Sequence, residues 1–187
     1  MLIQLLIQHP QAIFQVAKNT PRWVWGLLAA LLALGFSQLR NREISMTRMA
    51  ITPAAMVVLS VWSSASAFGA SPLIGYVMLA WATCAALMFG LIATRAPLPG
   101  TRYDAATRTF TVPGSWVPLL LILAIFTTKY IVGVDLAMQP ALAHDGTYTL
   151  VVGALYGVFS GVFAGRTARL WLLAHRSVSA ATPALTV

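Results

Sequence analysis

Lys129 and Asp135 interrupt an otherwise apolar segment, and they are the first residues whose chemistry asks for an explanation. Lys129 is 13 residues beyond Trp116, so a helix with a rise of 1.5 Å per residue carries it about 20 Å into the segment. A lysine at the centre of a bilayer costs at least about 2.5 kcal/mol and usually faces protein or water. We therefore expect Lys129 either to line a polar cavity for an anionic ligand or a proton, or to be satisfied by hydroxyl groups and fix helix register.

Asp135 is poorly placed to neutralise Lys129, although it is the nearest acidic residue in the sequence. Six residues along a helix rotate a side chain by about 240° and displace it by about 9 Å. We expect Asp135 near the outer rim, where Lys18 or Arg22 could neutralise it. Hydroxyl groups of other segments are better partners for the ammonium, namely Ser60, Ser63, Ser64, Tyr156 and Ser160.

A second group of charges lies around the segment 100–114. Residues 109–112 favour a strand and residues 104–107 can form a turn, which predicts a small β-hairpin. The hairpin would bring several arginines together as a basic mouth for a phosphate-bearing lipid or metabolite. The candidate ligand-binding residues are Lys129, Asp135, Arg102, Arg108, Arg166 and Arg169, with Arg40 and Arg42 nearby. The alternative is an ordinary connector with lipid-facing arginines.

Four glycines recur at every fourth position: Gly153, Gly157, Gly161 and Gly165. Without a hydrophobic driving force between helices in lipid, a strip of small residues lets two backbones approach closely. We expect this ladder to pack internally, against the third apolar segment, where Ala82, Ala86 and Gly90 have the same spacing. A homodimer contact is the alternative.

Catalytic and metal-binding patterns are missing from the sequence. The three histidines, His9, His144 and His175, fall at or beyond the ends of the apolar segments, which disfavours a buried bis-histidine haem or a Ser/His dyad. There is no H-E-x-x-H, paired acidic or C-x-x-C motif, and Cys84 is the single cysteine. We expect no metal and no cofactor, and a self-contained enzyme is disfavoured.

These residues must be positioned by membrane-spanning helices. Hydrophobic residues make up 59% of the 187 residues and charged residues only 9%, against about 25% charged in soluble domains. Continuous apolar runs of about 20 residues predict transmembrane helices rather than a barrel. The fold class is therefore an all-α membrane protein, a bundle of about five transmembrane helices near residues 23–39, 49–68, 72–94, 116–138 and 148–173.

The chain divides into three predicted regions: 1–20, 21–176 and 177–187. In residues 1–20, glutamines at alternating steps of four and three, followed by Lys18, predict an interfacial amphipathic helix. A sixth crossing by this segment is the alternative. Residues 21–176 form the transmembrane domain, and residues 177–187 are predicted to be a disordered tail.

Arginines fall almost entirely on one side of the five-span arrangement. By the positive-inside rule this side is cytoplasmic, which puts the N-terminus outside and the C-terminus inside. A surface this basic should attract anionic headgroups of membrane lipids. Nucleic-acid binding is disfavoured because the arginines are dispersed over three short segments beside a bilayer.

Three stretches carry a resemblance to known sequences: residues 103–119, from Tyr103-Asp104 to Trp116-Val-Pro-Leu, residues 126–130 and residues 153–166. Together they resemble a family of uncharacterised bacterial multi-pass inner-membrane proteins. The resemblance implies a location in the bacterial inner membrane. It carries no assigned activity.

Three functional hypotheses follow. The first is a non-enzymatic membrane protein that acts by association, as an accessory subunit of another membrane protein or as a homo-oligomer. The second is a transporter, or a binding protein for a small anionic solute or lipid, that uses Lys129. The third is a membrane enzyme acting on a lipid-soluble substrate through residues that no motif reveals.

Overall fold

The computed structural model describes residues 18–96, 99–104, 107 and 109–181. The chain divides into two units, each described here by itself. Unit 1 comprises Met1–Arg40 and Ser115–Asp145, and unit 2 comprises Asn41–Gly114 and Gly146–Val187. Most of the interfacial helix predicted for residues 1–20 lies outside the described residues.

Unit 1 is an antiparallel helix pair. Helix α3 (Arg22–Ser37) is followed, after an excursion of the chain through unit 2, by α6 (Val117–Met138) and the short 3-10 helix η1 (Pro140–His144). The pair is joined at one end by a hydrogen bond from Ser115 N to Gln38 O, at 3.2 Å. At the other end the hydroxyls of Thr20 and Tyr130 are 2.6 Å apart.

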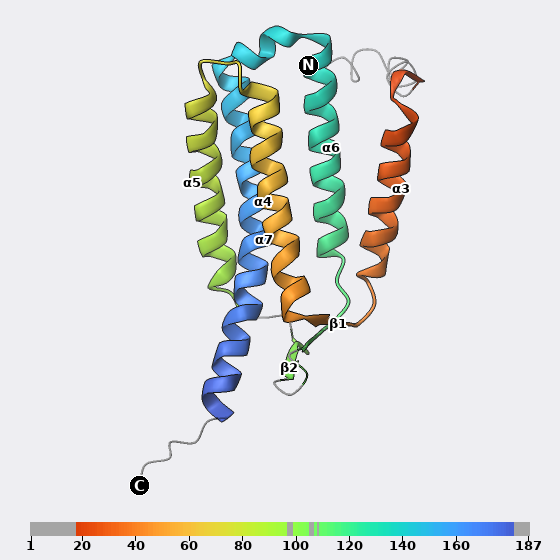
Figure 1. The fold of residues 1–187 in the computed structure, drawn as a ribbon, viewed down its shortest axis with the longest axis vertical. Helices are drawn as coiled ribbons and strands as arrows, with labels where there is room; N and C mark the ends of the chain where they lie inside the picture. Colours follow the sequence, from red (N-terminus) through yellow and green to blue (C-terminus); the bar gives the residue numbers. More distant parts are fainter. Residues whose placement is uncertain (1–17, 97–98, 105–106, 108, 182–187) are drawn as a thin grey trace. The chain divides into compact units, whose positions relative to one another are not determined.

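Unit 2 is built on a helical hairpin and one long helix. Helices α4 (Met46–Phe68) and α5 (Ile74–Ala93) are joined by a tight turn. In this turn Ser71 accepts a hydrogen bond from the Leu73 amide. Helix α7 (Gly146–Ala181) packs against both, and the three lie side by side in Figure 1. Its 36 residues correspond to about 54 Å, well beyond the hydrocarbon thickness of about 30 Å.

The glycine ladder of α7 faces α5. A Cβ at Gly153 would lie 2.7 Å from Val77 O, and one at Gly165 would lie 3.0 Å from Phe89 O. Between them, a Cβ at Gly157 would collide with Trp81 O. Facing residues differ by 76 in number (153 − 77, for example), so α5 and α7 run parallel in constant register. The glycines thus serve a close backbone contact within one chain.

The strip expected on α5 was the wrong one. Ala82, Ala86 and Gly90 are exposed, and a Cβ at Gly90 would meet nothing within 4 Å. The strip that faces the glycines consists of Val77, Trp81, Ala85 and Phe89, again at every fourth position. Spacing alone was misleading because glycines on one helix already allow the close approach, so the partner helix can present larger residues.

A three-stranded antiparallel sheet lies at the open end of the α4–α5 hairpin. Its strands are β1 (Arg42–Ser45), β2 (Arg102–Asp104) and β3 (Thr109–Val112), in the order β1-β3-β2. The β2–β3 pair is the hairpin predicted from the sequence. Strand β1 was not predicted, because Arg-Glu-Ile-Ser has a single apolar residue and does not alternate polar and apolar residues; only its burial alternates along the strand.

One face of the sheet is covered by the end of α7. Phe110 is fully buried in a cluster with Met49 of α4 and Ala174 of α7. Ile44, Tyr103, Val112 and Leu170 surround this cluster. The part of α7 beyond the ladder therefore serves as the support of the sheet.

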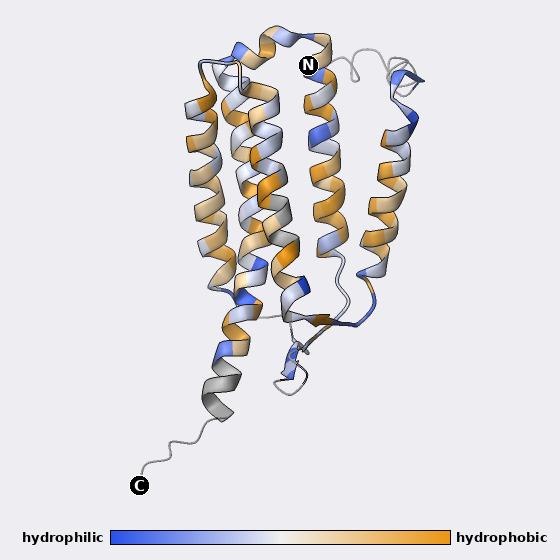
Figure 2. Ribbon diagram, viewed as in Figure 1, coloured by the Kyte–Doolittle hydropathy of each residue, from blue (hydrophilic) through white to orange (hydrophobic). Residues whose placement is uncertain are grey.

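Within the described residues, three helices are long and apolar enough to cross a membrane: Ile74–Ala93, Val117–Met138 and Gly146–His175. Figure 2 shows apolar colours along most of α5 and α6. Helix α3, with 16 residues, is a shorter apolar helix. The chain is thus a mostly helical protein with three candidate membrane-spanning helices among its described residues and a small sheet.

The predicted tail begins too early. Helix α7 continues to Ala181, whereas the sequence predicted disorder from residue 177. Ser-Val-Ser-Ala-Ala contains no glycine or proline that would end a helix. Small residues were read as a sign of disorder, but they also extend a helix that is already formed.

Candidate anion-binding site

Helix α5 ends close to one of the candidate binding residues, Arg169. Its 20 residues span about 30 Å, which matches the hydrocarbon thickness. Ala96 lies three residues beyond this helix, and its carbonyl accepts a hydrogen bond from Arg169 Nη1 at 3.3 Å. Arg169 is therefore held beside the end of a helix that is long enough to cross a membrane.

Arg166 and Arg169 lie three residues apart on α7, so they share one side of the helix. Arg166 interacts repulsively with the charges of Arg169 and Arg42. Arg42 lies opposite Val112 in the sheet. It is two residues before Ile44, so both side chains lie on the face turned towards α7. The sheet and α7 thus bring three arginines from distant parts of the sequence together, and they form the arginine cluster (Arg42, Arg166, Arg169).

Arg48 extends the positive charge onto the first turn of α4. Burial lowers the pKa of the Arg42 guanidinium from its usual value, and the charge of Arg48 lowers it further. Both causes raise the cost of holding the positive charge at Arg42. An anion bound beside the cluster would relieve the repulsion among these cations.

Of the other predicted arginines, Arg102 does not join the cluster. Arg102 lies opposite Thr111, as Glu43 does on the other side of β3, so both are exposed on the outer face of the sheet. Arg40 belongs to unit 1. Arg108 lies outside the described residues. The basic mouth expected from the sequence is therefore divided between the two faces of the sheet.

Two buried polar atoms lie on this side of unit 2. Among the described residues, Arg169 Nε and Thr101 Oγ1 have no hydrogen-bond partner. Thr101 follows Gly100, whose φ of +87° is a conformation that suits glycine. Buried polar groups are normally hydrogen-bonded. The sequence offered no signal for Thr101, because its position depends on the turn that returns the chain from α5 to β2.

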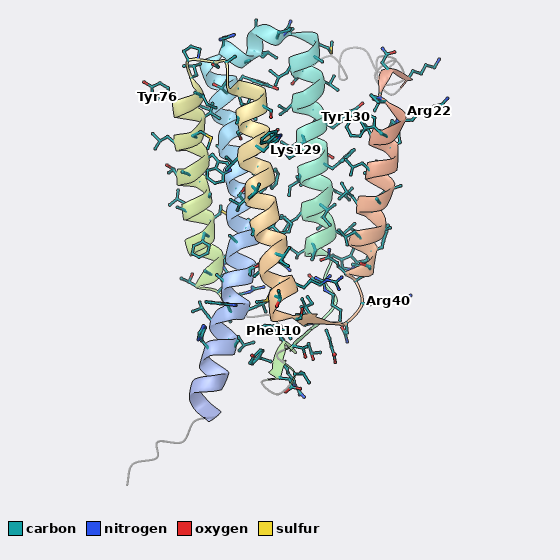
Figure 3. All side chains as sticks on the ribbon, viewed as in Figure 1. Arg22, Arg40, Tyr76, Phe110, Lys129 and Tyr130 are labelled. Atoms are coloured by element: carbon teal, nitrogen blue, oxygen red, sulfur yellow. The ribbon has the colours of Figure 1, made fainter. Side chains whose placement is uncertain are left out.

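Lys129 and Asp135 belong to α6 in unit 1. Lys129 is half-buried, and it leaves the helix on a different side from Tyr130 (Figure 3). Asp135 lies in the last turn of α6, as expected for a residue near the rim, but its side chain is only 3% exposed. Lys18 and Arg22 are exposed. That Lys18 or Arg22 neutralises Asp135 stays a prediction.

The hydroxyl groups considered as partners for Lys129 have hydrogen-bond partners within unit 2. Trp81 Nε1 donates to Ser60 Oγ at 3.1 Å, and Ser64 Oγ donates to Ser60 O at 3.0 Å. The hydroxyl of Tyr156 interacts with Ser63, and Ser160 Oγ donates to Tyr156 O at 2.8 Å. These bonds satisfy polar groups between α4, α5 and α7. Sequence reasoning could not see this network because it depends on which helices are neighbours.

Metal-binding side chains do not gather in the part of the chain that is described. No three of its histidine, cysteine, aspartate and glutamate side chains come close enough to hold a metal ion.

A known protein family matches most of this chain. The family described as "Family of unknown function (DUF6622)" matches residues 1–181. The chain belongs to the DUF6622 family. The resemblance to an uncharacterised family is thereby confirmed, and the DUF6622 match includes the arginine cluster and the glycine ladder. No curated protein and no solved structure matches this DUF6622 chain.

Proposed function

We propose that this DUF6622 protein is a non-enzymatic protein of the bacterial inner membrane that binds acidic phospholipids of the cytoplasmic leaflet. The observation that carries the proposal is the arginine cluster at the end of the apolar layer of unit 2. Arg169 donates a hydrogen bond to Ala96, just beyond α5, and Arg166 lies within range of the charges of Arg169 and Arg42. Near an acidic membrane surface each such charge contributes about 1 kcal/mol.

The arrangement in the membrane is five crossings, by α3, α4, α5, α6 and α7. Parallel packing of α5 and α7 supports it, because the chain between them must return across the layer that α5 spans. The arginine cluster follows α5 and the ladder of α7, so its side is the cytoplasmic one by the positive-inside rule. This orientation puts the N-terminus outside and the C-terminus inside.

The glycine ladder does not support self-association of this protein. All four glycines are buried, and all four face α5 of the same chain. An accessory role with another membrane protein would have to use a different surface. Lipid binding is therefore a better-supported form of association than a homo-oligomer built on the ladder.

Thermal unfolding in nanodiscs of defined composition tests the proposal. The full chain should unfold at a higher temperature in membranes with phosphatidylglycerol than in pure phosphatidylcholine, and salt should reduce the difference. A variant with Arg166→Gln and Arg42→Gln should lose most of this gain. Its control, Lys18→Gln with Arg22→Gln, removes the same charge from exposed residues of unit 1. Equal unfolding temperatures in both membranes would refute acidic-lipid binding.

A second candidate function is transport of an anion or proton through Lys129. The supporting observation is a half-buried lysine within the apolar helix α6, where ionisable residues usually have a function. Proteoliposomes with an internal pH dye can measure proton flux under an imposed potential. Lys129→Met should abolish a flux that Lys18→Met leaves intact, and unchanged flux in a folded Lys129→Met protein would exclude this role.

A further inference from the structure

The guanidinium of Arg169 is held by a hydrogen bond at one of its nitrogens. Nη1 donates to Ala96 O, whereas Nε is buried and has no hydrogen-bond partner among the described residues. We propose that Nε of Arg169, with Thr101 Oγ1 and the charge of Arg166, binds one phosphate group, that of a single phospholipid. This inference rests on the proposed function and names the atoms that make the binding specific.

The shape of the guanidinium favours a phosphate. Its donors form a planar fork, and two of them on one edge can reach two oxygens of the same anion. The bond to Ala96 uses Nη1 and fixes the plane. The edge that carries Nε is then presented in a set orientation. Lysine would supply the same charge without such an edge.

Thr101 supplies a hydroxyl donor on the same connection of the chain. The connection leaves α5, passes Ala96 and ends at Thr101, directly before β2. Gly100, with φ of +87°, allows the turn that brings Thr101 into its buried position. A hydroxyl and a guanidinium are both common donors to phosphate oxygens.

The described carboxylates of unit 2 lie on the opposite face of the sheet from Arg166 and Arg169. Glu43 is on the outer face of the sheet, and Asp104, also on that face, accepts a hydrogen bond from Thr107 at 2.9 Å. Arg166 and Arg169 lie on the other side, with Arg42. An anion from outside the chain can therefore be the counter-charge of Arg166 and Arg169.

Depth favours a lipid over a soluble ion as the source of the phosphate. Arg169 is bonded three residues beyond α5, where the hydrocarbon layer gives way to headgroups. Two residues further along α7, the ring of Trp171 is half exposed and packs against His175. Tryptophan prefers this interfacial depth.

The test is native mass spectrometry of the full chain in detergent, titrated with phosphatidic acid and, separately, with inorganic phosphate alone. Wild-type protein should saturate at one phosphatidic acid. Arg169→Lys should weaken this binding about tenfold or more, because charge is kept while the hydrogen-bonding edge is lost. Arg102→Lys is the matched control on the outer face and should bind as wild type does.

A second variant protects the test from misfolding. Thr101→Val keeps the size and removes one hydroxyl, and it should weaken phosphatidic acid binding in the same direction. Saturable, Arg169-dependent binding of inorganic phosphate at the same concentrations would uphold the site and make free phosphate its source. If neither probe is sensitive to Arg169→Lys and Thr101→Val, the inference is overturned.

The two proposals fail in different ways. Arg169→Lys keeps every charge, so the nanodisc preference for acidic lipids should persist in this variant. If wild-type protein shows no preference for acidic lipids in nanodiscs, the proposed function is refuted, and this inference with it. If the preference persists and Arg169→Lys binds phosphatidic acid as wild type does, only the discrete phosphate site is refuted.

Discussion

Two glycines, Gly157 of α7 and Gly90 of α5, differ in the space that their surroundings leave for a side chain. A Cβ at Gly157 would collide with the carbonyl of Trp81, whereas a Cβ at Gly90 would meet nothing within 4 Å. Both lie within helices, where alanine is the better helix former by about 1 kcal/mol. The same substitution should therefore have opposite effects at the two positions.

Gly157→Ala is expected to destabilise the protein by about 1–3 kcal/mol, since the backbone of α5 must move to accommodate the methyl group. This corresponds to a fall in Tm of about 2–4 °C per kcal/mol. Gly90→Ala should leave Tm unchanged or raise it. Thermal unfolding of both variants in the same detergent measures the difference, and equal Tm values would contradict the close α5–α7 contact.

The hydrogen bond between Thr20 and Tyr130 gives a second prediction at this scale, within unit 1. Tyr130→Phe and Thr20→Val should each cost about 1 kcal/mol, and the double variant should cost little more than either alone. The bond, at 2.6 Å, ties the segment before α3 to α6. A double-mutant cycle by chemical unfolding measures the coupling, and strictly additive losses would mean that no such bond forms.

At the scale of elements, the sheet depends on α7 more than on its own strands. Its strands have only three or four residues, too short for a sheet that is stable by itself. The ring of Phe110 contacts that of Tyr103, with 4.7 Å between the ring centroids and a tilt of 44°, and it is buried against Met49 and Ala174. The position of the arginine cluster therefore depends on packing between the sheet and the end of α7.

Phe110→Ala should release the sheet without unfolding the helices. Removing a fully buried phenylalanine costs about 3–5 kcal/mol, and this loss falls on the sheet. Hydrogen exchange in residues 102–104 and 109–112 should accelerate, while exchange in α5 stays slow. Thr111→Ala, at the neighbouring outer-face position, is the control and should leave exchange as in wild type. Faster exchange throughout α5 in Phe110→Ala would show that sheet and helices unfold together.

For the whole molecule, the number and direction of crossings follow from the chain path. Helices α5 and α7 run parallel, so both should end on the side of the sheet, and α6 should cross in the opposite direction. Exposed residues at the two ends report the sides: Glu43 and Thr107 near the sheet, Asn19 and Thr147 at the other end of their units.

Cysteine labelling tests this topology in a Cys84→Ser background. Glu43→Cys and Thr107→Cys should react with a membrane-impermeant maleimide only in inverted membrane vesicles. Asn19→Cys and Thr147→Cys should react only in right-side-out vesicles. Labelling of Glu43→Cys and Thr147→Cys from the same side would contradict the five-span arrangement.

Composition and periodicity by themselves determined the helical class and the approximate bounds of each helix. Apolar runs must bury their backbone polar groups in helices wherever they meet lipid, so segments such as 116–138 were close to the observed Val117–Met138. The β2–β3 hairpin was also predictable, since its turn and strand residues are local signals. Even the ladder was visible, because its four-residue spacing is a property of one helix.

Only the tertiary structure decided which surfaces meet. The partner strip of the ladder, the pairing of β1 with β3 and the separation of Arg102 from Arg42 all depend on contacts between distant segments. Arginines on different strands can lie on opposite faces of one sheet, because side chains alternate along each strand. The arginine cluster forms because one face of the sheet packs against α7. No local pattern in the sequence predicts this contact.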